Sequence, residues 1–289
     1  MSNNNSAPNN KLALGISLGI ITVLIASTVG AVGKHIGSDV NASAIVFFQY
    51  FFCLLCCLPW LLKHRLAGLK TQHPWLHTIR SLGGLVGFYV YWLALQYIPL
   101  VDTTLLRNAA PLVVPIIIFF WLGLGIPKTR WLPLIIGFIG ISVILRAGQH
   151  GISGWHIFGL LSGVGLAISM VSTSLLSKTE PSGRILFYYF FISLLFVTPY
   201  FIYEYRSIPS HAWPWLIYIG LAMYLSLHLY TTAFAYVKPS ILAPTSYFSV
   251  VFAGLLEWLI WGHIPDGWTL LGIALVVLGG LLILRFGKE

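Results

Sequence analysis

The stretch IVFFQYFFCLLCCLPWLL, residues 45–62, has a second copy at residues 185–202, where the chain reads ILFYYFFISLLFVTPYFI. The offset of 140 residues aligns Pro59 with Pro199, and it also aligns the Pro-Trp-Leu run at 74–76 with the one at 214–216. Aligned prolines indicate duplication more strongly than aligned apolar residues, because apolar segments resemble one another by chance. We therefore interpret the chain as two copies of one unit.

The composition around these copies is that of a membrane protein. Of 289 residues, 58% are hydrophobic and 8% are charged, whereas soluble domains average about 45–50% apolar and about 25% charged residues. About 20 apolar residues cross a hydrocarbon core of about 30 Å as a helix. This length predicts ten spans, at residues 12–33, 43–62, 75–97, 100–123, 131–146, 154–177, 184–203, 214–236, 239–261 and 267–285.

Ten spans and one duplication give five helices in each copy. A duplicated unit with an odd number of spans inserts its second copy upside down, as in many secondary carriers. We predict an all-α integral membrane protein with ten transmembrane helices arranged as two inverted five-helix repeats. The first repeat is expected at residues 12–148 and the second at 149–289, and the polar residues 1–11 are expected to be a disordered cytoplasmic N-terminus.

The basic residues are distributed unequally between the two sides of this arrangement. The side that holds the N-terminus carries 11 Lys and Arg residues and the opposite side carries 3, with Arg80 and Arg107 set aside because they lie within spans. The positive-inside rule then places both termini in the cytoplasm. We expect a multi-pass protein of the bacterial inner membrane, as a monomer or a homodimer. The scattered basic residues do not indicate nucleic-acid binding.

No cofactor or metal site is expected. The three cysteines, Cys53, Cys56 and Cys57, lie within one span without a neighbouring His or carboxylate, so we interpret them as packing residues. Intramembrane enzymes normally need clustered acids, histidines or a metal. The chain has seven Asp and Glu residues in total and no cluster of ligand spacing, which disfavours an enzyme.

Arg107 lies within the span 100–123 and is followed by Asn108. A charge at the centre of a membrane helix costs about 2.5–3.5 kcal/mol on insertion scales, so such a residue by default faces a cavity or a partner. We expect Arg107 and Asn108 to hold an anionic group of a solute. A structural salt bridge of Arg107 and snorkelling of its side chain to the membrane surface are the alternatives.

Three further ionisable residues in or near spans are candidates for coupling or gating, namely Glu257, Asp102 and Arg80. Glu257 could pair with Arg107, bind a proton or meet a substrate cation. For Asp102 the alternative is a structural role at a helix start, and for Arg80 it is anchoring to lipid phosphates.

Aromatic and polar residues complete the predicted binding set. Tyr89, Trp92 and Gln96 share a helical face, and the repeat alignment pairs Tyr89 with His228 and Asn108 with Tyr247. His228 could alternatively be a buried histidine bonded to a neighbouring helix. We predict that the substrate-binding residues are Arg107, Asn108, Tyr89, Trp92, Gln96, Tyr224, His228 and Tyr247.

The run ALQYIPLVDTTLLRNAAPLVVPIIIFFWLGLG, residues 94–125, followed by GFIGISVIL, resembles the drug/metabolite transporter superfamily, and specifically its EamA-type members. The corresponding run in the second copy begins AFAYVKPSILAPTSYF at residue 233. The resemblance implies ten helices and a central cavity between helices 3, 4, 8 and 9. Family members often have a glutamate where this chain has Ile126 and His263, so a role of that acid does not carry over.

We therefore expect a secondary transporter that moves a small metabolite, an amino acid or related amphipathic solute, by alternating access. We expect an exporter or exchanger, and proton coupling is one option for its energy source. The run HTIRSLGGLVGFYVYW, residues 77–92, is similar to the subgroup that includes S-adenosylmethionine transporters, and uptake of such a metabolite is the alternative. A channel or an intramembrane enzyme is less favoured.

Overall fold

The computed structural model is all-helical and describes residues 6–123, 125, 128, 131–147, 153–233, 245–246, 248–263 and 266–286. Its α-helices are α1 (Ser6–Ile36), α2 (Ala42–His64), α3 (Pro74–Leu95), α4 (Leu100–Arg107), α5 (Ala110–Leu122), α6 (Trp131–Ala147), α7 (Gly154–Leu176), α8 (Ser182–Tyr203), α9 (Trp213–Ala233), α11 (Phe248–Trp261) and α12 (Gly267–Phe286). Two short 3₁₀ helices, η1 (Leu66–Leu69) and η3 (Ser210–Ala212), lie in connections.

Seven helical segments within the described residues are long and apolar enough to cross a membrane. They correspond to the predicted spans 12–33, 43–62, 75–97, 100–123, 154–177, 184–203 and 214–236. The other three predicted spans contain shorter apolar helical segments, at Trp131–Gly140, Phe248–Trp261 and Gly267–Gly279. A multi-pass helical membrane protein is therefore confirmed.

The fourth predicted span is interrupted, since α4 ends at Arg107 and α5 begins at Ala110. Pro111 lies in the first turn of α5. A proline in that position loses no hydrogen bond, because the first N–H groups of a helix have no partner within it. Continuation of α4 through Pro111 would instead lose a bond, so the helix breaks at Asn108 and Ala109.

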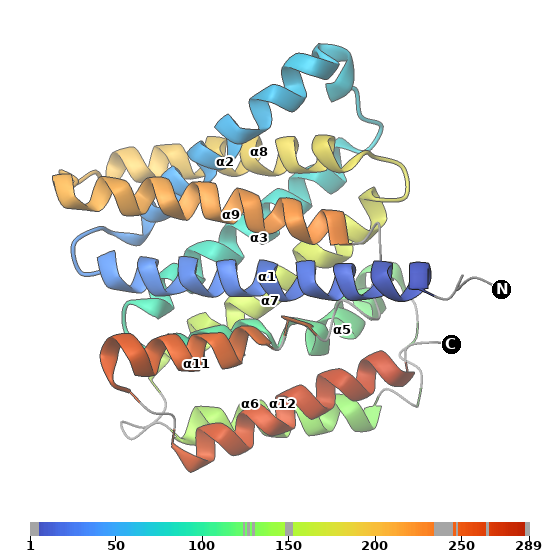
Figure 1. Ribbon diagram of the computed structural model, residues 1–289, viewed down its shortest axis with the longest axis vertical. Coiled ribbons are helices and arrows are strands. Elements are labelled where there is room, and N and C mark those ends of the chain that lie inside the picture. The colour runs from blue at the N-terminus through green and yellow to red at the C-terminus, as the bar shows by residue number, and fades with distance from the viewer. Residues whose placement is uncertain are drawn as a thin grey trace.

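The helices pack in layers that run across the bundle in Figure 1. Helix α1 packs along α9, α3 packs along α7, and α6 packs along α12 at the lower edge of the view. The start of α1 and the end of α12 lie at the same end of the bundle (Figure 1). Among the described residues, the largest buried apolar cluster is formed mostly by residues of α1, α2, α3, α8 and α9, with Leu100 of α4 and Ala253 of α11.

Glycines allow α3 and α7 to touch at their backbones. A Cβ atom on Gly165 of α7 would lie 2.7 Å from the carbonyl oxygen of Gly83 and 2.6 Å from the Cα atom of Gly87, both on α3. A Cβ atom on Gly163 would lie 2.7 Å from the carbonyl oxygen of Leu106, at the end of α4. Such close approach is typical of membrane helices with small residues at one-turn spacing. Helix α7 thus holds α3 and the break after α4 together.

Glycines also end the two helices that the repeat alignment pairs, α5 and α11. Gly123 has a φ of 65° and Gly262 a φ of 68°, in the left-handed region that favours glycine. Each donates its N–H to the carbonyl four residues earlier, Gly123 to Phe119 at 3.1 Å and Gly262 to Trp258 at 2.9 Å. These helix ends are the same in both halves of the chain.

Candidate functional site

Arg107 is the last residue of α4, and its guanidinium lies against α3. Its Nη1 donates to the carbonyl oxygen of Gly87 at 3.1 Å. Its Cζ lies 4.1 Å from the centre of the Phe88 ring and 5.2 Å from that of Tyr91. An arginine over ring faces gains cation–π attraction, which grows when the pair is removed from water. The side chain is half-buried, and it bonds to one carbonyl without a carboxylate partner among the described residues.

Asn108 joins the break after α4 to α11. Its Nδ2 donates to the carbonyl oxygen of Thr104 at 2.8 Å and to Oγ of Ser249 at 2.5 Å. The Ser249 hydroxyl in turn donates to the carbonyl oxygen of Ser246 at 2.6 Å. Asn108 therefore connects the first half of the chain to the second immediately beside Arg107.

Arg80 of α3 is a second buried guanidinium, with 8% of its surface exposed. Its Cζ lies 3.8 Å from the centre of the Tyr189 ring, and its Nη1 donates to the hydroxyl of Ser169 on α7. Its Nε atom is buried and has no hydrogen-bond partner. Arg80 thus lies inside the protein. This position does not fit the alternative that Arg80 anchors the helix to lipid phosphates at the membrane surface.

The hydroxyls of Tyr50 on α2 and Tyr189 on α8 lie 3.0 Å apart. Both tyrosines interact electrostatically with Arg107, and Tyr50 also interacts with Arg80. We call the set of Arg80, Arg107, Tyr50, Tyr91 and Tyr189 the arginine layer. The sequence analysis missed Tyr50 and Tyr189, although they belong to the aligned copies 45–62 and 185–202.

The other predicted binding residues lie outside this layer. Trp92 is buried and donates from Nε1 to Oε1 of Gln49 at 3.1 Å. Tyr89 packs edge-on against Tyr200, with ring centres 5.5 Å apart. Gln96 donates from Nε2 to the carbonyl oxygen of Val40 at 3.4 Å.

The two predicted residues of α9 form a pair of their own. The rings of Tyr224 and His228 stack with centres 6.1 Å apart, and the His228 side chain is exposed on the helix surface. Tyr247 lies outside the described residues. The structure therefore brings Arg107 and Asn108 together, with Arg80 close to the same tyrosines, and leaves these two residues of α9 apart from them.

Glu257 of α11 is the centre of a separate polar site. Glu257 is 2% exposed. Its carboxylate accepts a hydrogen bond from Lys34 Nζ at 2.6 Å and another from the backbone N–H of Leu100 at 2.7 Å. Of the partners considered from the sequence, Arg107 is therefore not the one that Glu257 binds. Asp102 is buried in the first turn of α4 and interacts electrostatically with Glu257 and Lys34.

A cavity of about 280 Å³ lies beside this ion pair. It is lined by Lys34, Gln96, Tyr97, Ile98, Pro99, Glu257, Trp261 and His263. Lys34 also lies over the Trp261 ring, 4.9 Å from its centre. The cavity thus combines an ion pair with aromatic walls at the ends of α1, α3 and α11.

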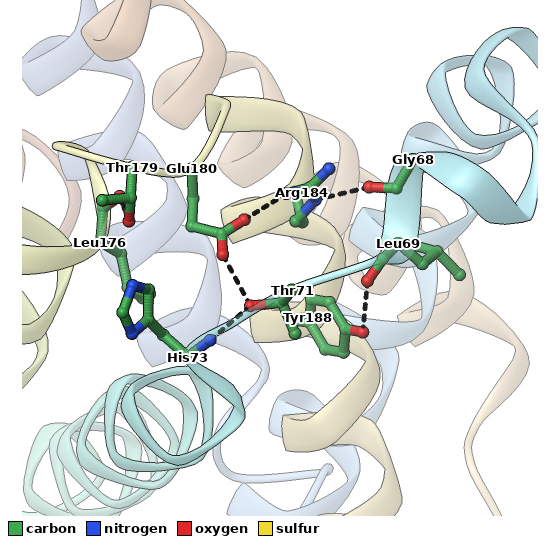
Figure 2. A network of polar contacts seen from close by, with 9 residues as sticks. All are labelled: Gly68, Leu69, Thr71, His73, Leu176, Thr179, Glu180, Arg184 and Tyr188. Carbon is green, nitrogen blue, oxygen red and sulfur yellow. Dashed lines mark hydrogen bonds and ion pairs between the residues drawn. The ribbon is translucent and has the colours of Figure 1, made fainter.

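A third polar group joins the connection after α2 to the start of α8 (Figure 2). Glu180 accepts from Thr71 Oγ1 at 2.6 Å and from Arg184 Nη1 at 2.5 Å. Arg184 Nε donates to the Gly68 carbonyl at 2.5 Å, and the Tyr188 hydroxyl donates to the Leu69 carbonyl at 2.7 Å. We call this group the loop clasp. It joins the segment after α2 to the start of α8.

The loop clasp lowers the pKa of Glu180. Burial would raise the pKa of this carboxyl, but the hydrogen bonds from Thr71 and Arg184 and the charge of Arg184 outweigh burial. The ionised form is therefore the one that the clasp holds. Sequence reasoning missed it, because its two sides, residues 68–71 and 180–188, lie more than 100 residues apart in the chain.

Comparison with known proteins identifies two copies of one family unit. The model of the EamA-like transporter family matches residues 13–146 and again residues 153–285. A solved crystal structure with 17% identity superposes with a TM-score of 0.66 and covers 95% of this chain and 97% of that one, which shows a shared fold.

Curated relatives are transporters of different metabolites. The pseudopaline exporter CntI of Pseudomonas aeruginosa (strain UCBPP-PA14) is 26% identical over 96% of this chain and 98% of its own length. The S-adenosylmethionine uptake transporter of Rickettsia bellii is 23% identical over 96% and 95%. The riboflavin transporter of Rhizobium johnstonii is 26% identical over 85% and 81%. With nearly the whole chain matched by the family model, the protein belongs to the EamA-like transporter family.

Proposed function

We propose that the protein is a secondary transporter that binds an anionic group of a small metabolite at Arg107 and Asn108 and works by alternating access. The observation that carries this proposal is the position of Arg107 at the α4–α5 break, over the rings of Phe88 and Tyr91 and without a carboxylate partner among the described residues. A guanidinium held by ring faces and one carbonyl keeps most of its donors available for a carboxylate.

We also propose that the chain forms two inverted five-helix repeats, 12–148 and 149–289, with ten membrane segments and both termini in the cytoplasm. Two matches to one family model support the duplication. The packing of α1 on α9 and of α3 on α7 supports a two-fold relation between the copies, because such an axis exchanges these two pairs. The odd number of spans in each copy, five, is the argument for the inversion. Fusions of alkaline phosphatase and of green fluorescent protein to residue 289 would test on which side this end of the chain lies. For a cytoplasmic end, the green fluorescent protein fusion is expected to fluoresce and the alkaline phosphatase fusion to be inactive.

The proposed direction is export or exchange of an amino acid or related amphipathic solute. The relatives include an exporter and uptake transporters, so uptake of an S-adenosylmethionine-like metabolite is the second candidate. Residues 77–92, which include Arg80 and Trp92, are similar to the subgroup that contains S-adenosylmethionine transporters, and this similarity supports the second candidate.

Counterflow in proteoliposomes tests the function. Vesicles loaded with unlabelled L-glutamate, S-adenosylmethionine or riboflavin are diluted into the same labelled compound, and transient accumulation is expected for at least one of the three. Arg107→Gln is expected to abolish it, while Arg206→Gln, which removes an exposed arginine outside the helices, is expected to retain it. Undiminished counterflow with Arg107→Gln would contradict the assignment of Arg107. Flux that does not saturate would indicate a channel.

A further inference from the structure

We infer that the transported solute carries two separated acidic groups, one bound by Arg107 and the other by Arg80. This inference rests on the proposed transport function and specifies its substrate class. The two guanidiniums come from different helices and share a tyrosine: Arg80 of α3 lies over the Tyr189 ring, and Arg107 of α4 interacts electrostatically with Tyr189.

The first argument is the unused hydrogen-bonding capacity of Arg80. Its Nε has no hydrogen-bond partner in the protein. Only 8% of the residue is exposed, so bulk water does not supply one. A buried donor left unpaired costs on the order of 1–3 kcal/mol, and more when the group is charged. An arginine presents its donors as a planar fork that matches a carboxylate. A solute carboxylate would give Nε the acceptor that the folded chain does not supply.

The second argument is the positions of the acids. The chain has seven carboxylate side chains, and six of them lie in the described residues. Glu180 pairs with Arg184, Glu257 with Lys34, and Asp39 with His211. Glu204 accepts from Tyr200, and Asp266 accepts from the backbone of Thr269.

The sixth described acid, Asp102, also does not neutralise the arginine layer. Its electrostatic neighbours are Glu257, Asp266 and Lys34. The described residues therefore place two guanidiniums inside the bundle, and no described carboxylate forms an ion pair with either of them. Uncompensated charge at membrane depth is costly. A monoanion would compensate one guanidinium, whereas a solute with two acidic groups compensates both.

The third argument is the separation of the two arginines along α3. Arg107 contacts α3 at Gly87, seven residues after Arg80, and seven residues span about 10 Å of helix. The Tyr50–Tyr189 hydroxyl pair lies beside both arginines. Two acidic groups joined by a short flexible linker fit this arrangement better than one compact dianion, because the two forks approach from different helices.

Binding of linear dicarboxylates to the purified full-length protein tests the inference. The unfolding midpoint in detergent is titrated with succinate, adipate and suberate, with hexanoate as the monoacid and sulfate as the compact dianion. We expect one diacid to bind about tenfold more tightly than hexanoate, as one additional charged hydrogen bond implies. Equal binding of hexanoate, or binding of sulfate as tight as that of the best diacid, would overturn the inference.

Variants assign the two ends of the diacid. Arg80→Gln is expected to reduce diacid binding about tenfold, to the level of hexanoate, while hexanoate binding is unchanged. Arg206→Gln is the control and is expected to retain the wild-type difference. If Arg80→Gln does not fold, the wild-type comparison of diacid with hexanoate still decides. Counterflow of S-adenosylmethionine or riboflavin, together with equal binding of the diacids and hexanoate, would refute the inference and leave the transport function standing. Diacid binding without counterflow of any of the three probes would support the site for two acidic groups and would count against the proposed transport function.

Discussion

Lys34 and Glu257 form an ion pair of 2.6 Å although 223 residues separate them in the sequence. The pair connects the end of α1 to α11, and the second Glu257 oxygen accepts from the first N–H of α4. One carboxylate thus fixes the ends of three helices, from both halves of the chain, beside the 280 Å³ cavity.

Removing one member of this pair should destabilise the protein. Lys34→Met leaves the buried Glu257 charge uncompensated, and such loss typically costs about 3–5 kcal/mol. The double variant Lys34→Met/Glu257→Gln removes both charges and keeps an acceptor for the Leu100 N–H, so it should recover most of the loss. Unfolding midpoints of the single and double variants measure the coupling, and strictly additive effects would contradict it.

The contact between α3 and α7 should not tolerate a methyl group. Gly165→Ala places a Cβ atom 2.7 Å from the Gly83 carbonyl oxygen, and overpacking of this kind costs about 1–3 kcal/mol. Gly254→Ala is the matched control, since its Cβ atom would meet only Val101 Cγ2 at 3.8 Å. The unfolding midpoint should fall for Gly165→Ala and stay or rise for Gly254→Ala.

The loop clasp should make stability depend on acid pH. The pKa of Glu180 lies below its ordinary value of 4.5 in the folded protein. The stabilisation by Glu180 is therefore fully present above pH 4.5 and is lost as the pH falls through the lowered pKa. The midpoint measured between pH 7 and pH 3 should fall less steeply in Glu180→Gln than in the wild type, and Thr71→Val should be intermediate. Identical slopes in all three proteins would exclude the clasp as the cause.

Arg107→Lys should impair transport although it keeps the positive charge. The Arg107 guanidinium lies over the Phe88 and Tyr91 rings and presents a planar fork to a carboxylate, whereas an ammonium has no such fork. Counterflow by the probe that the wild type transports should decrease about tenfold or more, in line with the loss of one charged hydrogen bond. Arg206→Lys is the control, and wild-type rates for Arg107→Lys would show that charge alone suffices.

The membrane class and most helix positions could be predicted from the sequence because both depend on local hydrophobicity. The sequence analysis treats residues 100–123 as one span, whereas the structure divides this span at Asn108 and Ala109, shortly before Pro111. The partner of Glu257 could not be predicted, since nothing in the local sequence relates it to Lys34.

The candidate site was predicted in part. Arg107 and Asn108 were selected because charge and amide groups are rare at that depth, and the structure places them at the break beside α3. Tyr50 and Tyr189 were missed because a tyrosine in an aromatic-rich span does not differ from its neighbours until the fold brings the two hydroxyls together.

The backbone contact of Gly165 with Gly83 and Gly87 has a mechanical consequence. At Gly165 the backbones of α3 and α7 meet with no side chain between them, so a tilt of α3 is expected to move α7 with it. Arg80 belongs to α3, and Arg107 is bonded to α3 through the Gly87 carbonyl. A movement of α3 is therefore expected to displace both guanidiniums together.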